Sequence, residues 1–214
     1  MARVTKEHLD ARKNQILDAA WSCFGRRGYH QTTMQEVATE AGISAGAIYR
    51  YYPSKEAVLQ AISERALETD QSLIVGARAH ADEPIDALEL LGAVVVSNFR
   101  APDFQEKARV IIEMRPELLR DKKLSREQRR HLDLLRESIA GLMADAQKRG
   151  QLLPELDPES LAILSLAVYE GLRAYNLVDP EHFRPERVFN LLRQVLRPEA
   201  YRPEGAQQQK ETAE

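Results

Sequence analysis

The segment that decides the fold lies between residues 32 and 55 and has the sequence TTMQEVATEAGISAGAIYRYYPSK. Its first half carries apolar residues at three- and four-residue spacing, namely Met34, Val37, Ala38 and Ala41. Such spacing predicts one buried stripe on a short helix. Gly42 follows the stripe at the position where a residue with positive φ ends a helix. The segment therefore predicts a short helix that stops in a tight turn.

A second short helix is predicted to begin directly after this turn. Ser44 occupies its N-cap position, where a hydroxyl accepts a hydrogen bond from a free backbone N–H. The inward residues are Ala47, Ile48 and Tyr52, and the outward residues are Ala45, Gly46, Tyr49 and Arg50. Small outward groups followed by two long hydrogen-bonding side chains suit a helix that enters the major groove of DNA. The two helices and their turn predict a helix-turn-helix.

The same turn contains a pattern that is typical of a hydrolase nucleophile. Residues 42–46, GISAG, match G-x-S-x-G, which in α/β-hydrolases exposes a catalytic serine after a β-strand. The residues before Ser44 have helical and not strand periodicity, so the N-cap interpretation is favoured over the catalytic one. We expect no enzyme activity from this chain.

The segment around residues 10–60 resembles the TetR/AcrR family of transcriptional regulators. The residues that carry the resemblance are Leu17, Ala19, Ala20, Phe24, Gly28, Tyr29, Thr32, Thr33, Val37, Ala38, Gly42, Ile43, Ser44, Gly46, Tyr49, Tyr51, Pro53, Lys55 and Glu56. The chain departs from the family at Tyr52, where Phe is usual, and at Arg50, where an aromatic residue is common. The departure at Arg50 is expected to alter the choice of operator and not the fold.

We expect eight residues of this segment to contact DNA. Thr33 and Lys55 are placed at helix starts, where phosphates bind readily. Tyr49 and Tyr51 are expected to reach phosphate or sugar. The residues expected to face base edges are Ser44, Ala45, Gly46 and Arg50.

The composition of the 214 residues is compatible with an all-α protein of one or two domains. The first residues lack the apolar segment of a secretory signal, and the apolar run from Leu161 to Tyr169 is shorter than the roughly 20 residues that span a bilayer. We therefore expect a cytoplasmic protein without a membrane partner. Cys23, the single cysteine, is predicted to be a small core residue.

Charge is distributed unevenly along the chain. Residues 1–55 carry eight basic and five acidic side chains, whereas the remainder carries 22 basic and 28 acidic ones. A basic end and an acidic remainder suit a protein that meets phosphate with one end only.

Helical periodicity continues through the rest of the chain and predicts about nine helices in all. The expected segments outside the motif are 7–27, 54–79, 84–99, 103–116, 125–149, 158–178 and 185–196. Ser125 is predicted to cap the seventh helix, and Pro116 to kink or loosen the sixth. We expect residues 7–53 to form a three-helix DNA-binding domain, residues 54–197 a larger ligand-binding and dimerisation domain, and residues 198–214 a tail.

The last two helices are predicted to form a dimer interface. The helix at 158–178 is apolar nearly all round, which indicates burial on more than one side. The resemblance to TetR regulators implies a four-helix bundle across a two-fold axis. The residues assigned to it are Leu161, Val168, Leu172, Val188, Leu191, Leu192 and Val195. The alternative is that both helices only fill the core of a single chain.

A small-molecule effector is expected to bind among the helices of the larger domain. RVIIEMRPELLRD and YEGLRAYNLVDPE are distantly similar to the ligand domain of BetI-type members of the family. The candidate effector residues are Phe99, Glu113, Met114, Tyr169 and Arg173. Glu113 and Arg173 could instead point to solvent or pair with neighbours. An aromatic cage is conceivable, but aromatic residues at helical spacing are usually core; its members would be Phe99, Phe104, Tyr169 and Tyr175.

No cofactor or metal ion is expected. The five histidines are scattered, and no two of them have the i, i+4 spacing of ligands. Glu127 and His131 have this spacing, but on a charge-rich helix where a solvated pair is the better interpretation.

These patterns together predict a ligand-responsive DNA-binding regulator that acts as a homodimer. We expect a repressor that a small-molecule effector releases from a near-palindromic, double-stranded operator. The alternative is a helical small-molecule-binding or interaction protein that no longer reads DNA.

Overall fold

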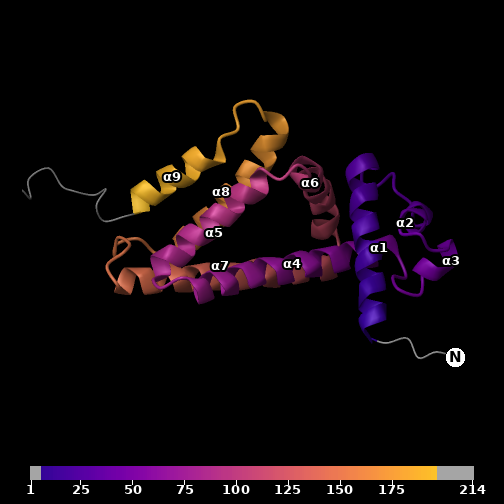
Figure 1. Cartoon of the computed structure of the whole chain (residues 1–214), viewed down its shortest axis with the longest axis horizontal. Helices are drawn as coiled ribbons and strands as arrows, with labels where there is room; N and C mark the ends of the chain where they lie inside the picture. Colours follow the sequence, from indigo (N-terminus) through magenta and orange to yellow (C-terminus); the bar gives the residue numbers. More distant parts are fainter. Residues whose placement is uncertain (1–5, 197–214) are drawn as a thin grey trace, which may run out of the picture. The chain divides into compact units, whose positions relative to one another are not determined.

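The computed structural model describes residues 6–196, and of Leu118 and Val195 it describes the backbone alone. This part of the chain contains nine α-helices and no strand, so the prediction of an all-α fold with about nine helices is confirmed (Figure 1). The helices are α1 (Lys6–Arg27), α2 (Met34–Glu40), α3 (Ala45–Ile48), α4 (Lys55–His80), α5 (Pro84–Phe99), α6 (Phe104–Arg120), α7 (Lys122–Lys148), α8 (Pro158–Val178) and α9 (Pro185–Leu196). The predicted tail at 198–214 lies outside the described residues.

The chain divides into two compact units. Among the described residues, the first comprises 6–71 together with 101–132, and the second comprises 72–100 together with 133–196. The divisions fall inside α4, inside α7 and just after α5, so each unit is built from separate stretches of sequence. The predicted boundary near residue 53 coincides with the start of α4 and marks no change of compact unit.

The first unit has one apolar core, to which the N-terminal helices and α6 contribute. Its fully buried large side chains include Ile16, Phe24, Val37, Ile48, Val58, Leu59 and Val110. The rings of Phe24 and Tyr29 meet edge to face with centroids 5.2 Å apart, an arrangement that aromatic quadrupoles favour. Cys23 is buried in the same core, and burial raises the pKa of its thiol, as expected for a core residue.

A glycine lets α6 pack closely against α1. A Cβ atom at Gly25 would overlap with the side chain of Glu106. Further along the contact, Gly28 ends α1 with φ of 84°, and Oε2 of Glu113 would lie 3.0 Å from a Cβ placed there. Gly28 is therefore required both by its backbone conformation and by the limited space beside α6.

The second unit is held by two smaller apolar clusters. One joins Ile74, Ala87, Leu135 and Leu142, and the other joins Met143, Ala146, Leu152 and Leu161. Leu161 is 7% exposed, whereas Ile163 and Leu164 on the same helix are 54% and 47% exposed. Thus α8 buries one part of its surface in the chain and leaves another apolar part in contact with solvent.

Helix α8 is also the one helix in residues 6–196 whose length and apolar composition would allow it to cross a membrane. Core and interface helices of soluble proteins meet the same criterion, so this observation is weak support for a membrane span.

The prediction that Ser125 caps the seventh helix is wrong. Helix α7 begins at Lys122, because Oδ1 of Asp121 accepts hydrogen bonds from the backbone N–H groups of Lys123 at 2.7 Å and Leu124 at 3.0 Å. Ser125 is already inside the helix, where its N–H donates to the carbonyl of Asp121. Helix α6 continues through Pro116 to Arg120, so proline does not end it.

Replacing Asp121 with Ala should lower the melting temperature at pH 7, since two backbone N–H groups at the start of α7 lose their acceptor. The same two hydrogen bonds hold the pKa of the Asp121 carboxyl below its usual value. Its contribution is therefore complete above the unfolded-state pKa of about 3.9 and is lost as the pH falls through the lower folded value. Calorimetric melting of both proteins should show a temperature difference that shrinks on acidification. Ser125→Ala is the matched control, and an equal loss of stability in that variant would contradict the assignment of the cap.

Candidate nucleic-acid interface

Two side-chain caps fix the ends of the helices in the 32–55 segment. The Thr33 hydroxyl accepts from the N–H of Glu36 at 3.2 Å, and the Glu36 carboxylate accepts from the N–H of Thr33 at 2.8 Å, which completes a capping box. Ser44 accepts from the N–H of Ala47 at 3.2 Å and caps α3, and Gly42 has φ of 63° between the two helices. The predicted N-cap at Ser44 and the turn at Gly42 are confirmed.

The cap at Ser44 also excludes the hydrolase interpretation of residues 42–46. No strand precedes Ser44 in the described part of the chain, and its hydroxyl is used by the backbone of α3.

Helix α3 is held by one fully buried side chain and presents its other side to solvent. Ile48 has no exposed surface, whereas Tyr49 is 53% exposed and Ser44, Gly46 and Arg50 are also exposed. Ala45 is half-buried. Three of the four residues predicted to lie on the outward side of this helix are thus accessible, as is the N-cap Ser44, in a row that begins with small groups and ends with a guanidinium.

Gly46 has no neighbour that would require a glycine. A Cβ atom at this position would meet nothing within 4 Å, and the residue has ordinary helical backbone. Glycine in a helix lowers stability by roughly 0.5–1 kcal/mol relative to alanine. Packing within the chain gives no reason for it, whereas the close approach of a partner to the backbone of α3 would.

Ion pairs hold α2 against α1 and occupy its carboxylates. Arg26 donates to Oε2 of Glu40 at 2.8 Å, and Arg27 pairs with Glu36. The bond from Arg26 lowers the pKa of the Glu40 carboxyl. These pairs are largely exposed and add little stability, but they neutralise both carboxylates on the helix that precedes α3. Sequence reasoning missed this function of Arg26 and Arg27, and their position in the last turn of α1 was the available signal.

Lys55 is turned toward the backbone of the protein. Its Nζ donates to the carbonyls of Tyr29, His30 and Thr32 at 2.9, 3.3 and 3.0 Å, and it lies 4.4 Å from the centroid of the Tyr29 ring. Removal from water lowers the pKa of this ammonium, and burial raises the pKa of the Tyr29 hydroxyl to about 12. Lys55 therefore ties the first turn of α4 to the loop between α1 and α2.

Thr33 and Tyr51, the two remaining residues predicted to contact DNA, lie near the two ends of the helix-turn-helix. Thr33 is exposed, and its hydroxyl both caps α2 and donates to Oε2 of Glu36 at 3.0 Å. Tyr51 is half-buried and packs against the core of the first unit.

Three of the five predicted effector residues come together in the second unit. The rings of Phe99 and Tyr169 have centroids 5.7 Å apart, and the guanidinium carbon of Arg173 lies 4.5 Å from the centroid of the Tyr169 ring. Phe183, which the sequence did not indicate, packs edge to face on Phe99 at 5.2 Å. Arg173 is buried and does not point to solvent.

The other two predicted effector residues belong to the first unit. Met114 is 3% exposed in its core, and Glu113 lies beside Gly28. Phe104 and Tyr175 are the two other candidates for an aromatic cage. Phe104 belongs to the first unit, whereas Tyr175 stacks on Phe183 with ring centroids 6.5 Å apart.

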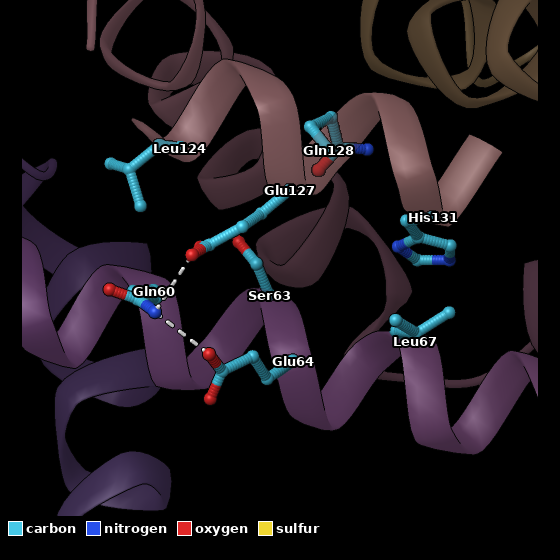
Figure 2. Close-up of a pocket in the computed structure, with 8 residues that line it drawn as sticks. All are labelled: Gln60, Ser63, Glu64, Leu67, Leu124, Glu127, Gln128 and His131. Atoms are coloured by element: carbon cyan, nitrogen blue, oxygen red, sulfur yellow. Dashed lines mark hydrogen bonds between the residues drawn. The ribbon is translucent and has the colours of Figure 1, made fainter. Parts of the chain in front are cut away.

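A small cavity of about 30 Å³ lies between α4 and α7 in the first unit (Figure 2). Gln60 donates through Nε2 to Glu64 at 2.8 Å and to Glu127 at 3.3 Å across it. The interpretation of Glu127 and His131 as a solvated pair is wrong, because His131 is only 8% exposed and its Nε2 lies 3.4 Å from Oδ2 of Asp70. A cavity of this size holds about one water molecule. No group of three or more potential metal ligands occurs in residues 6–196.

The residues assigned to a dimer interface differ in exposure. Leu191 is 59% exposed, whereas Val168, Leu172, Val188 and Leu192 are half-buried. Leu161 is packed in the core of its own unit. The side chain of Val195 lies outside what the structure describes.

A capped helix-turn-helix with exposed polar residues at both ends of its second helix, α3, is typical of a DNA-binding protein. Comparison with known proteins agrees with this class. Residues 16–62 match the bacterial regulatory proteins of the tetR family, and residues 87–207, more than half of the chain, match the C-terminal domain of BetI-type transcriptional repressors.

Two curated relatives align over most of their length. The transcriptional regulator TtgR of Pseudomonas putida is 32% identical over 177 residues, which are 80% of this chain and 83% of TtgR. The transcriptional repressor BepR of Brucella suis is 30% identical over 172 residues, which are 79% of this chain and 82% of BepR. A transcriptional regulator from Saccharomonospora viridis, solved in complex with choline, has the same fold with a TM-score of 0.72 at 22% identity, over 86% of this chain and 94% of its own.

The chain belongs to the TetR family of transcriptional regulators. Proteins of this family are ligand-responsive regulators that bind DNA, which confirms the function predicted from the helix-turn-helix. The relatives are regulators and not enzymes.

Replacing Lys55 with Ala should lower the free energy of unfolding by about 1–3 kcal/mol, since three backbone carbonyls lose a charged donor. Urea denaturation followed by circular dichroism measures this change. Arg50→Ala is the control, because Arg50 is exposed and its side chain makes no hydrogen bond or ion pair with the described residues. Equal stability of the two variants would show that Lys55 does not stabilise the protein by joining α4 to the loop between α1 and α2.

Proposed function

We propose that this protein is a repressor that binds a near-palindromic operator as a homodimer and leaves it when a small-molecule effector binds. The observation that carries the proposal is the set of exposed residues at α3, namely Ser44, Gly46, Tyr49 and Arg50, on a helix that the fully buried side chain of Ile48 holds against the core. In this proposal residues 7–53 bind DNA, residues 54–197 bind the effector and form the dimer, and the protein acts in the cytoplasm.

The contacts that we propose follow from the accessibility of each residue. Ser44, Ala45, Gly46 and Arg50 face base edges, and the bare backbone at Gly46 allows α3 to enter the groove deeply. Tyr49, Tyr51 and Thr33 reach the sugar–phosphate backbone, which positions the protein without reading sequence. A phosphate contact by Lys55 requires that its ammonium give up one of its three carbonyl partners.

The proposed dimer uses the apolar side of α8 that the single chain leaves exposed, together with α9. Ile163, Leu164 and Val178 are 54%, 47% and 86% exposed, and Leu191 on α9 is 59% exposed. Each Leu, Ile or Val removed from water contributes about 1.5–3 kcal/mol. A rigid two-fold contact is also needed to hold two recognition helices about 34–36 Å apart, one turn of DNA.

The proposed effector site lies in the second unit at Phe99, Tyr169 and Arg173. Mostly apolar surroundings with a few polar groups are typical of small-molecule sites. An effector releases DNA only if it binds more tightly to a conformation that fits the operator poorly. Among the relatives, the regulator from S. viridis was solved with choline, which supports a small molecule as the ligand of this fold.

The alternative, a helical protein that no longer reads DNA, requires loss of the polar row on α3. Ser44, Tyr49 and Arg50 are present and exposed, and we therefore favour the regulator.

Arg50→Ala should relax the sequence preference at one or two operator positions and weaken binding by about 1–3 kcal/mol, because a guanidinium that donates twice to guanine is lost. Fluorescence anisotropy with promoter DNA of the gene itself and its neighbours measures the affinity, and a randomised operator library measures the preference. Arg129→Ala, on the exposed side of α7, is the matched control. An unchanged preference in Arg50→Ala would contradict its contact with bases, and the absence of salt-sensitive, sequence-specific binding by the unmodified protein would contradict the proposed function.

Leu191→Glu should convert the dimer to a folded monomer that binds the operator weakly, since a carboxylate without a partner would be buried at the interface. The side chain is exposed in the single chain, so the helical content should be retained. Sedimentation velocity measures the oligomeric state. Val75→Glu is the control, because Val75 is a similarly exposed apolar residue, at 68%, outside the proposed contact. A Leu191→Glu protein that remains dimeric would place the interface elsewhere.

A further inference from the structure

Two polar side chains are buried on the same side of α8. Arg173 is 8% exposed and Asn176 is 6% exposed, and their spacing of three residues makes them neighbours on the helix surface. Arginine is rarely buried to this extent unless its donors are used. The hydrogen bonds of the pair therefore need to be accounted for.

Only one nitrogen of the Arg173 guanidinium is engaged. Nη1 donates to Oε1 and Oε2 of Glu170 at 3.0 and 3.2 Å, and the flat face of the group lies over Tyr169. Nε and Nη2 make no hydrogen bond to any residue of the described chain. These two nitrogens form one edge of the guanidinium, and such an edge binds both oxygens of a carboxylate.

Asn176 adds an acceptor that is also unused. Its Oδ1 is buried and receives no hydrogen bond from residues 6–196. Buried side-chain acceptors are nearly always paired, so an unpaired one three residues from Arg173 on α8 favours a partner from outside the described residues. Here the missing partner must be a donor, such as a hydroxyl or an amine.

An aromatic cluster adjoins Arg173 through Tyr169. Tyr169 and Phe183 both pack on Phe99, with centroids 5.7 and 5.2 Å away. These rings come from α5, from α8 and from the loop before α9, so three separate stretches of sequence converge at the same place. Apolar walls with a few polar groups that fix orientation are the common composition of a ligand site.

We propose that Arg173 and Asn176 recognise a small organic acid that carries a hydrogen-bond donor. The Nε and Nη2 edge of Arg173 binds the carboxylate, a hydroxyl or amine of the acid donates to Oδ1 of Asn176, and its apolar part contacts Phe99 and Phe183. This inference rests on the proposed function, since the acid is the effector of the regulator.

A cationic effector fits this arrangement poorly. One face of the Tyr169 ring is already occupied by the guanidinium of Arg173 and is not available to a cationic ligand. The site thus differs in chemistry from one suited to choline, although a regulator of the same fold was solved with that ligand.

Four probes separate the features of the proposed ligand. 3-Hydroxybenzoate has the carboxylate, the donor and a ring; benzoate lacks the donor, 3-hydroxybenzyl alcohol lacks the charge, and choline has the opposite charge. Titration calorimetry with the full chain should give 3-hydroxybenzoate the lowest Kd, about tenfold or more below that of the alcohol, as expected for hydrogen bonds to a charged group. Only the acids should displace the operator at constant ionic strength.

Variants test the two residues individually. Arg173→Lys keeps the charge but loses the paired donors, and should raise the Kd for 3-hydroxybenzoate about tenfold or more. Asn176→Asp has nearly the same shape but repels the acid, and should also raise the Kd. Arg187→Lys, at an exposed arginine of α9, is the matched control and should leave the Kd unchanged. Circular dichroism checks that each variant is folded, and operator affinity without ligand should stay at the value of the unmodified protein.

The outcomes distinguish this inference from the proposed function. If the protein binds its operator but neither acid binds more tightly than the alcohol, the assignment of an acidic effector is wrong and the regulator stands. The same conclusion follows if the folded Arg173→Lys and Asn176→Asp proteins bind 3-hydroxybenzoate as well as the unmodified chain. If no operator is bound at all, the proposed function itself fails.

Discussion

A helix of four residues, such as α3, makes too few backbone hydrogen bonds to persist alone in water. Its existence and its orientation therefore depend on burial of Ile48, which has no exposed surface, in the core shared with α1, α2 and α4. Tyr52, 7% exposed, adds a second anchor directly after the helix. The side of α3 that can meet DNA is fixed because the opposite side must be buried.

Several polar contacts determine where α2 and α3 begin and how α4 is attached to the loop before them. The capping box of Thr33 and Glu36 starts α2, the hydroxyl of Ser44 starts α3, and the ammonium of Lys55 binds the loop that precedes them both. Each of these groups satisfies backbone atoms that the short helices would otherwise leave unpaired. The helix that we propose to read DNA is thereby held at both ends, although few residues are available to hold it.

The surface of α8 has an exposed apolar side and a buried side with polar residues, and these two features account for its unusual composition. Toward solvent it shows apolar side chains such as Ile163 and Val178, which suit contact with a second copy of the chain. Within the second unit it buries Arg173 and Asn176, whose hydrogen-bonding groups are incompletely used. A helix that was only core would need neither feature. The alternative that α8 simply fills the interior of one chain does not explain this exposed apolar surface.

The sequence by itself determined the helical elements and the helix-turn-helix, because these depend on short-range spacing. The glycine at 42, the hydroxyl at 44 and the apolar stripe before them act within a few residues, so their effect is visible in the chain. Only the tertiary structure decided where long side chains point. Lys55 turns to carbonyls at positions 29, 30 and 32, and His131 is buried on a helix whose charges predicted exposure. In both cases the deciding partner is distant in sequence, and no local pattern records which atoms will lie within hydrogen-bonding distance.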